Sequence, residues 1–527
     1  MNILVKRGLL LTKSAQYNAI LSFKSTSCVF LIIHRNNWIT DLFCLALFLL
    51  LFYTVFLGSY PLFTPDEGRY AEIALNMIHT SDYITPRVNG AIFLDKPILY
   101  FWLQACAIKL LGVNEWAVRL FPALFGILGV IITYSCGRVL FDRRSGLIAA
   151  IILATTPLYF GGTHYANLDL EVAVLISCSL LTFLSALYSP HRLYFLFIAY
   201  ASAALAFLTK GLIGFVFPIM IIGTWVLLTK QWRVLKKIYF IPGLILIMSI
   251  VTPWYILVQK ANPSFIHYFF VGQQITRYLS GRIFNNQMPI WFFIPVILIG
   301  FLPWIFFVLP AFLKSISPEN PIKLFLLLWV TIVFTFFSIP HSKLVGYILP
   351  IFPPFALLVG HYLSATWNQS KRFLFIICVS VNIIFLLTLT ASASYLNRTS
   401  VKPLALQLQH IIQPQDEVVA YFRYYQDIPF YFGQHITVAA DWSPSIIEQN
   451  DNWLREFWNS TLFENKKNNR FINEYVFWQR WQTKHLLVLV SANRLDQFRI
   501  HTKNYSILGE YNNVFLISNS SDAIKAK

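Results

Sequence analysis

Eleven long apolar stretches constrain this chain of 527 residues more than any other feature. Each approaches the ~20 residues that a helix needs to cross a bilayer core. Only 12% of the residues are charged and 57% are apolar, which leaves too little polar surface to cover a soluble fold. We therefore predict a polytopic α-helical membrane protein with about 11–13 transmembrane helices, not an ordinary cytosolic enzyme or a disordered chain. The stretches are 38–58, 116–137, 145–160, 169–187, 193–208, 212–229, 238–258, 289–313, 323–339, 344–363 and 372–394.

The basic residues, which give the chain a net charge of +18, indicate how these stretches are oriented. One set of alternating loops carries most of the loop Lys and Arg, whereas the short loops of the other set hold only Lys210 and Lys343. Basic residues accumulate on the cytoplasmic side of a membrane, and the N-terminal segment is also basic. We therefore predict a cytoplasmic N-terminus and an external C-terminus. The basic excess is then a topology signal, and we expect no nucleic acid partner.

The distribution of apolar residues divides the chain into three predicted regions. Residues 1–37 form a cytoplasmic N-terminal segment, and residues 38–395 form a transmembrane domain with two long outer loops at 59–97 and 259–288. Residues 396–527 lose the continuous apolar runs and alternate short strand-like and helix-like segments, which predicts a small external α/β domain. The six cysteines have no metal-ligand spacing, which argues against a disulfide framework and a Cys-ligated zinc.

The first outer loop contains the densest group of ionisable residues near the membrane. Its segment Thr64-Pro65-Asp66-Glu67-Gly68-Arg69-Tyr70 predicts a helix to about His79, with Thr64 as N-cap and Glu67 completing a capping box. Asp66, Arg69 and Tyr70 then share one helical face. Glu67 suits the positive end of the helix dipole. Ionisable groups next to the apolar region of a membrane are costly and mark function, so Asp66 and Arg69 are candidate site residues.

Further ionisable residues stand at other outer ends of the predicted helices. Asp95-Lys96-Pro97 precedes an apolar run, and Lys96 suits a phosphate group as a point charge. Asp169 lies at the mouth of the fourth stretch, two residues from Glu171, and the two face different ways on a helix. Lys343 and Tyr347 are spaced i, i+4, which predicts that they share a helical face at the outer end of the tenth stretch. Lys210 stands beside Gly211 in another outer turn.

Five motifs in order carry a family resemblance: TPDEGRYAEIA, LDKPILYFW, NLDLEV, FLTKG and HSKLVGYILPIFPP. They resemble the bacterial aminoarabinose transferases, lipid A-modifying glycosyltransferases related to the protein O-mannosyltransferases. The resemblance covers about residues 38–363. It implies the GT-C membrane fold, a bacterial inner-membrane location, and transfer of a sugar from a polyprenyl-phosphate carrier on the periplasmic side.

The resemblance also implies roles for individual residues. Asp66 is the acidic residue near the reacting acceptor, and Asp169 is a second acidic position in the cavity. Phosphates of carrier or acceptor are held by Arg69, Lys96 and Tyr347, with Tyr70, Lys210, Arg277 and Lys343 as further binding candidates. As the sugar leaves the carrier, negative charge grows on its phosphate, and such cations stabilise it.

A metal is the remaining expectation from the resemblance. The family associates zinc with the acid before the Lys-Pro pair, so Asp95 is the candidate ligand for zinc or another divalent metal. Asp95 replaces the usual Glu, and Gln273 and Gln274 stand where the family often shows Glu and His. His267 is the nearest substitute.

The expected function is transfer of 4-amino-4-deoxy-L-arabinose from a polyprenyl-phosphate carrier to lipid A phosphate. One alternative is a mannosyltransferase-like enzyme that acts on protein or another glycan. A membrane transporter is an alternative of another class, although transporters place ionisable groups at mid-membrane. A non-catalytic membrane scaffold is a further alternative, but it would not explain why ionisable residues cluster at the outer ends of the predicted helices.

Overall fold

The computed structural model describes residues 27–279, 285–315, 320–449, 451–464 and 469–520. The first 26 residues of the predicted N-terminal segment 1–37 lie outside this range. The chain divides into two compact units, Met1–Phe52 and Tyr53–Lys527. Helix α2 (Ser27–Thr54) covers the first predicted stretch up to Thr54, four residues short of its predicted end, and its last two residues belong to the second unit. Every feature of the site described below belongs to the second unit.

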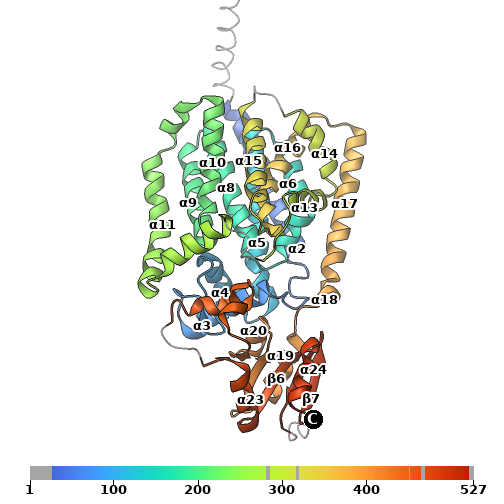
Figure 1. The fold of residues 1–527 in the computed structure, drawn as a ribbon. Helices are drawn as coiled ribbons and strands as arrows, with labels where there is room; N and C mark the ends of the chain where they lie inside the picture. The colour runs from blue at the N-terminus through green and yellow to red at the C-terminus, as the bar shows by residue number, and fades with distance from the viewer. Residues whose placement is uncertain (1–26, 280–284, 316–319, 450, 465–468, 521–527) are drawn as a thin grey trace, which may run out of the picture. The chain divides into compact units, whose positions relative to one another are not determined.

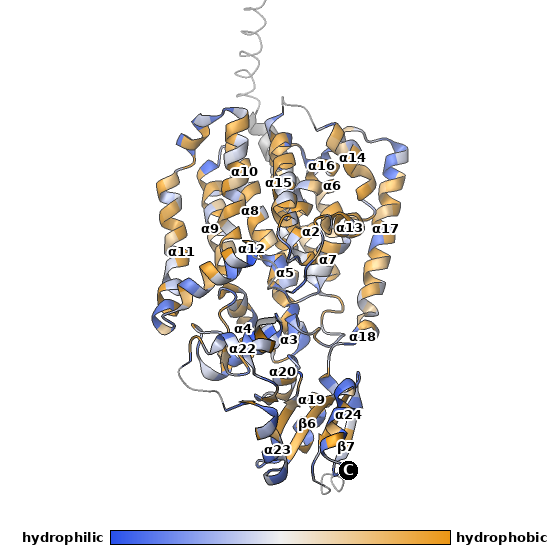
Figure 2. Cartoon of the chain, in the orientation of Figure 1, coloured by the Kyte–Doolittle hydropathy of each residue, from blue (hydrophilic) through white to orange (hydrophobic). Residues whose placement is uncertain are grey.

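Every predicted apolar stretch coincides with a helix or a bent pair of helices, which confirms a polytopic helical membrane protein (Figures 1 and 2). Within the described residues, seven helical segments are long and apolar enough to cross a membrane, or nine with each bent pair counted as one span. The seven are α5 (Glu115–Leu140), α8 (Leu168–Tyr188), α9 (Arg192–Lys210), α11 (Phe240–Ala261), α15 (Pro321–Ser338), η4 with α16 (Val345–Ala365) and α17 (Gln369–Ala391). The bent pairs are α6 (Arg143–Ala154) with α7 (Pro157–Thr163), and α13 (Phe293–Gly300) with α14 (Ile305–Leu313). Shorter apolar helical segments are Trp38–Thr54, which is part of α2, and α10 (Ile213–Thr229).

Side-chain caps fix where several of these helices begin. Asn114, Asp142, Asn167, Asn320 and Asn368 each accept a backbone N–H from the first turn of the helix that follows. Such a cap satisfies a donor that the helix cannot pair internally. The cap at Asn167 starts α8, whose apolar window is 94% buried among the other helices. The central helix of the bundle therefore has a fixed starting point, and Asp169 lies in its first turn.

The first outer loop folds as helix α3 (Asp66–Thr80), the hairpin β1–β2 (Arg87–Val88 and Ala91–Ile92) and helix α4 (Leu99–Leu111). Helix α3 ends one residue beyond the prediction, but the predicted capping box is wrong. The hydroxyl of Thr64 donates to the backbone of Thr399 at 3.1 Å, and Glu67 accepts the backbone N–H of Phe63 at 2.7 Å. Glu67 is turned inward because it pairs with a buried arginine.

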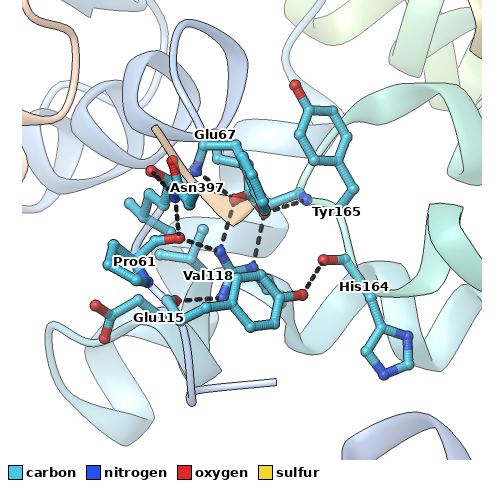
Figure 3. A network of polar contacts seen from close by, with 12 residues as sticks. Pro61, Glu67, Glu115, Val118, His164, Tyr165 and Asn397 are labelled. Carbon is cyan, nitrogen blue, oxygen red and sulfur yellow. Dashed lines mark hydrogen bonds and ion pairs between the residues drawn. The ribbon is translucent and has the colours of Figure 1, made fainter. Parts of the chain in front are cut away.

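Glu67 and Arg119 form an ion pair in which both side chains are fully buried (Figure 3). Arg119 donates to both carboxylate oxygens, at 2.8 Å from Nε and 2.6 Å from Nη2. It also donates to the backbone oxygens of Leu57, Tyr60 and Pro61 at 2.7–3.0 Å. The Glu67 carboxylate accepts a further bond from the backbone N–H of Ala166 at 2.7 Å. One pair thus ties α3 to α5, to the segment before α3 and to the turn that precedes α8.

The C-terminal region is built on a six-stranded mixed sheet of order β5-β4-β3-β6-β8-β7. Strands β5, β4, β3 and β6 are parallel neighbours, while β8 is antiparallel to β6 and β7. The strands are β3 (Glu417–Tyr421), β4 (Thr437–Ala439), β5 (Phe471–Ile472), β6 (Leu486–Ser491), β7 (Ser506–Tyr511) and β8 (Val514–Ser518). The helices are α18 (Ala393–Leu396), α19 (Lys402–Ile411), α20 (Ile428–Phe432), α21 (Pro444–Gln449), α22 (Trp453–Ser460), α23 (Glu474–Thr483) and α24 (Ala492–His501).

This region is bonded closely to the first outer loop. The Asn89 side chain donates to the oxygen of Ile436 and accepts from its N–H, at 2.8 and 2.9 Å. Glu115 accepts from the hydroxyl of Tyr431 at 2.9 Å and pairs with Lys402. Because these contacts are buried or half-buried, they hold the sheet region against the β1–β2 hairpin and the start of α5.

The buried pair generates a stability prediction. Arg119→Met leaves the Glu67 carboxylate buried without its cation, so we expect a loss of about 3–5 kcal/mol in the free energy of unfolding. Thermal unfolding of the protein purified in detergent measures this loss. The double variant Glu67→Gln/Arg119→Met should recover part of it, because no uncompensated charge is left buried. Arg499→Met is the matched control, because Arg499 pairs with Asp496 on the exposed surface. Equal shifts for Arg119→Met and Arg499→Met would contradict the assignment.

Candidate active site

A polar cavity of about 600 Å³ lies where the first outer loop, the bundle and the C-terminal region meet. It gathers residues from segments that are far apart in the sequence, between Pro65 and Asn459. The sequence-predicted residues that line it are Asp66, Arg69, Tyr70, Asp95, Lys96, Asp169, Lys210, Arg277 and Tyr347. Of the ten predicted site residues, only Lys343 is absent from this lining within the described part of the chain.

Arg69 lies between two carboxylates that come from opposite ends of the chain. Its Nη2 is 2.5 Å from Oδ1 of Asp66, one helical turn away, and its Nη1 is bonded to Oε1 of Glu456 in α22. The guanidinium also lies over the rings of Tyr70 and Phe93, at 5.1 and 5.7 Å. The predicted face of α3 is therefore formed, and Arg69 is held in one orientation.

Asp66 keeps one carboxylate oxygen outside its ion pair with Arg69. Its second oxygen accepts from the side-chain amide of Asn167 at 3.2 Å and lies 3.4 Å from the hydroxyl of Tyr165. The side chain retains 24% exposure, against 11% for Arg69. One oxygen thus neutralises the arginine, while the other carries weaker bonds and faces the cavity, as a proton acceptor requires.

Asp169 forms the opposite side of the cavity with Lys210 and Tyr347. The Lys210 amine pairs with Oδ1 of Asp169 and lies 4.2 Å from the centre of the Tyr347 ring. The neighbouring Gly346 permits this packing, because a Cβ there would stand 2.3 Å from Oδ2 of Asp169. Helices α8 and α9 and the segment η4 (Val345–Ile351) therefore converge on one ion pair.

Lys96 and Arg277 add positive charge at the same side of the cavity. Burial lowers the pKa of Lys96 to about 8, and the nearby Arg277 and Lys210 act in the same direction while Asp95 opposes them. Within the described residues, no hydrogen bond or ion pair occupies the Lys96 amine. Arg277 begins α12 (Arg277–Leu279), directly after the π-helix η2 (His267–Thr276). A concentration of cations of this kind favours an anionic ligand.

A second cavity, of about 310 Å³, opens next to the first and is largely apolar. Residues of α10, of η2 with α12 and of α15 line it, among them Val216, Ile275 and Phe336. The two cavities share five lining residues, which are Lys96, Lys210, Gln273, Arg277 and Tyr347. An apolar groove between membrane helices therefore meets a polar chamber at three cations and one tyrosine.

Lys343 is placed differently from the other predicted residues. Its amine donates to the backbone oxygen of Met288 at 3.0 Å and to that of Pro340, and the residue is 2% exposed. The predicted helical face shared with Tyr347 does not form, because Leu344 is extended and η4 begins only at Val345. In this structure Lys343 joins two outer segments and does not point into the chamber.

The surroundings of Asp95 do not fit a metal site. Its carboxylate accepts a hydrogen bond from the hydroxyl of Tyr268, which in turn accepts from the amides of Gln273 and Asn459 at 3.0 and 3.1 Å. His267 is exposed. No group of three or more His, Cys, Asp or Glu that could hold a metal ion occurs in the described residues. Amide and phenol groups take the places that metal ligands would need.

Three residues that the sequence analysis did not select contribute to the site. Glu456 pairs with Arg69, Tyr268 binds Asp95, and Asn167 bonds to Asp66. The sequence pattern could have identified Asn167, because it stands two residues before Asp169 in a helix-capping position. Glu456 carried no signal, because it lies in a polar helix of a region expected to fold apart from the bundle.

The packing around Asp169 yields a test of this geometry. Gly346→Ala forces the Asp169 carboxylate away from Lys210, so we expect a loss of about 1–3 kcal/mol in stability. Gly272→Ala is the matched control, because that glycine also lines the chamber but has no atom within 4 Å of an added Cβ. Thermal unfolding in detergent compares the two variants. The proposed packing fails if both are equally stable.

Known proteins resemble the chain in both sequence and fold. Residues 95–257 match the family model described as dolichyl-phosphate-mannose-protein mannosyltransferase. An undecaprenyl phosphate-α-4-amino-4-deoxy-L-arabinose arabinosyl transferase of Aeromonas hydrophila is 33% identical over 329 residues, which cover 60% of this chain. The match spans 58% of that relative, so the chain spans less than two thirds of the length of the curated relative it matches.

Solved structures extend the similarity to nearly the whole chain. The crystal structure of ArnT from Cupriavidus metallidurans bound to undecaprenyl phosphate matches with a TM-score of 0.80 and 23% identity, over 92% of this chain and 99% of that one. The archaeal oligosaccharyltransferase AglB from Archaeoglobus fulgidus matches with a TM-score of 0.51 and 13% identity, over 93% and 75%. The resemblance to the aminoarabinose transferase family of GT-C membrane glycosyltransferases is thereby confirmed.

Proposed function

We propose that this protein transfers a sugar from a polyprenyl-phosphate carrier to an acceptor at the membrane surface. The observation that carries the proposal is the junction at which the apolar groove meets the polar chamber. A polyprenyl phosphate has the same division, with a long apolar chain joined to one anionic group. Lys96, Lys210 and Arg277 stand at the junction. With the chain in the groove and the phosphate at these cations, the attached sugar lies in the chamber.

The chamber residues supply the chemistry that such a transfer needs. The bond between the anomeric carbon and the phosphate oxygen breaks, and the negative charge that develops on the phosphate is stabilised by the junction cations. An acceptor oxygen forms the new bond to that carbon. If the acceptor is a hydroxyl, Asp66 is the base that removes its proton, with Asp169 second because its side chain is less exposed, at 10% against 24% for Asp66. If the acceptor is a phosphate, positioning by cations carries more of the barrier.

The relatives support a specific donor, acceptor and location. The Aeromonas relative is named for 4-amino-4-deoxy-L-arabinose on undecaprenyl phosphate, so this is the proposed donor. Lipid A phosphate is the proposed acceptor, on the periplasmic side of the bacterial inner membrane with the N-terminus in the cytoplasm. The basic residues of alternate loops support that orientation. A mannosyl donor with a protein acceptor is the second candidate, supported by the family match over residues 95–257.

Mass spectrometry of lipid A tests the function directly. Cells with this chain should show lipid A that is heavier by one aminopentose, and cells without it should not. Asp66→Asn should lower the transfer rate by about 100-fold or more if the acceptor is a hydroxyl, and by less if it is a phosphate. Asp496→Asn, which changes an exposed carboxylate, is the control. Unmodified lipid A together with mannosylated protein would replace the first candidate by the second.

The groove gives an independent prediction about the donor. Val216→Trp fills part of the apolar cavity, so we expect the KM for a donor with a full undecaprenyl chain to rise roughly tenfold. A donor with a chain of two isoprene units should be affected less. Ile219→Trp is the matched control, because it lies on the same helix but is 70% exposed at its outer face. A KM that is unchanged for the long donor would rule out this groove as the carrier site.

A further inference from the structure

Glu456 is a carboxylate from the C-terminal region that is inserted into the chamber of the transmembrane region. It lies on α22, and its side chain is 23% exposed. Its partner Arg69 is one turn from the candidate base Asp66. Asn459, three residues further along α22, donates to the hydroxyl of Tyr268 at 3.1 Å. The same face of α22 thus contacts both sides of the chamber, and the position of Glu456 is fixed by more than its own ion pair.

Arg69 differs from the other chamber cations in where it stands. Lys96, Lys210 and Arg277 line both the groove and the chamber, whereas Arg69 lines the chamber alone. If the carrier phosphate occupies the junction, as the proposed function requires, Arg69 remains for an anion that enters from the acceptor side. One of its terminal nitrogens is already bonded to Glu456. An incoming anion and Glu456 must therefore compete for the same donor group.

We propose that Glu456 is a placeholder for the anionic group of the acceptor, which displaces it from Arg69 on binding. This inference rests on the proposed function and adds a specificity-determining residue to it. In the empty chamber the Glu456 carboxylate pairs with the Arg69 guanidinium, because a buried cation without a partner would cost free energy. A phosphate on the acceptor replaces that carboxylate. A neutral acceptor cannot make this exchange, so the contact selects for acceptors that carry an anion.

The charges around Glu456 make the exchange depend on pH. Burial raises the pKa of Glu456 to about 7, with Arg69 opposing the rise. The other charged groups that influence it are Asp95, Asp66 and Asp451, all of which favour its protonation, and Arg455 also lines the chamber. Below about pH 7 the carboxylate is protonated and releases Arg69 readily. As the pH rises above 7 it becomes charged and competes with the acceptor anion.

Inorganic phosphate tests the exchange without any assumption about the acceptor. The full-length protein in detergent is first saturated with undecaprenyl phosphate, which fills the junction cations. Calorimetric titration with phosphate should then show Glu456→Gln binding about tenfold more tightly than the wild type at pH 8, one unit above the pKa of about 7. The difference should vanish at pH 6. Titrations in buffers of different ionisation enthalpy should show that the wild type takes up more protons than Glu456→Gln.

Glu464→Gln is the matched control, because Glu464 is also a carboxylate of the C-terminal region and pairs with Arg87 of the first outer loop at 3.0 Å. It does not line the chamber and should leave phosphate binding unchanged. Thermal unfolding and retained undecaprenyl phosphate binding verify that Glu456→Gln is folded. Equal phosphate affinity of wild type and Glu456→Gln at pH 8 would overturn the inference, as would weaker binding by the variant.

Turnover provides a second arm with lipid A as the acceptor. At pH 8 Glu456→Gln should lower the KM for lipid A several-fold and leave the KM for the donor unchanged. A higher donor KM would mean that Glu456 binds the sugar, and a lower kcat with both KM values unchanged would mean that it only positions Arg69; either result rejects the placeholder role. Absence of transfer by the wild type would instead contradict the proposed function, while the phosphate titration still decides the inference.

Discussion

The buried pair of Glu67 and Arg119 is the constraint on which the rest of the site depends. Removing two charges from water is costly, and the cost is offset only when every polar atom is satisfied. Here the remaining donors and acceptors reach three backbone oxygens and two backbone N–H groups of the surrounding segments. Asp66 directly precedes Glu67, and Asn167 directly follows the bonded Ala166. The pair therefore sets the distance between the candidate base and its neutral hydrogen-bond partner.

The two cavities reflect the two solvents that the chain faces. Apolar side chains of the membrane helices line the groove, and charged side chains appear where the helices end. Placing a charge at a helix end costs less free energy than placing it at mid-membrane. The low dielectric of the neighbouring apolar region also strengthens the electrostatic interaction of these charges with a ligand. A ligand that is apolar at one end and anionic at the other can satisfy both environments at once. Neither cavity alone would identify such a ligand.

Local pattern was enough to predict the helices, and together with the family resemblance it pointed to many of the charged residues that line the chamber. Apolar length located every membrane helix, and spacing on α3 brought Asp66 and Arg69 together, because helical periodicity fixes such contacts. Lys343 shows the limit of this reasoning, since its predicted face requires a helix that begins only after it. Glu456 shows another limit. It reaches Arg69 across 387 residues of sequence, and no local pattern encodes a contact of that range.

The departures from the family pattern at Asp95 and Gln273 fall within one hydrogen-bond network. The Asp95 carboxylate accepts a hydrogen bond from the hydroxyl of Tyr268, and that hydroxyl in turn accepts from the amides of Gln273 and Asn459. Each amide comes from a different segment, one from η2 and one from α22, so the network joins the second outer loop to the C-terminal region. A metal ion with ligands from the same segments would hold them together in the same way. In this structure the hydroxyl of Tyr268 takes that part, because it bonds to the first outer loop, the second outer loop and the C-terminal region at once.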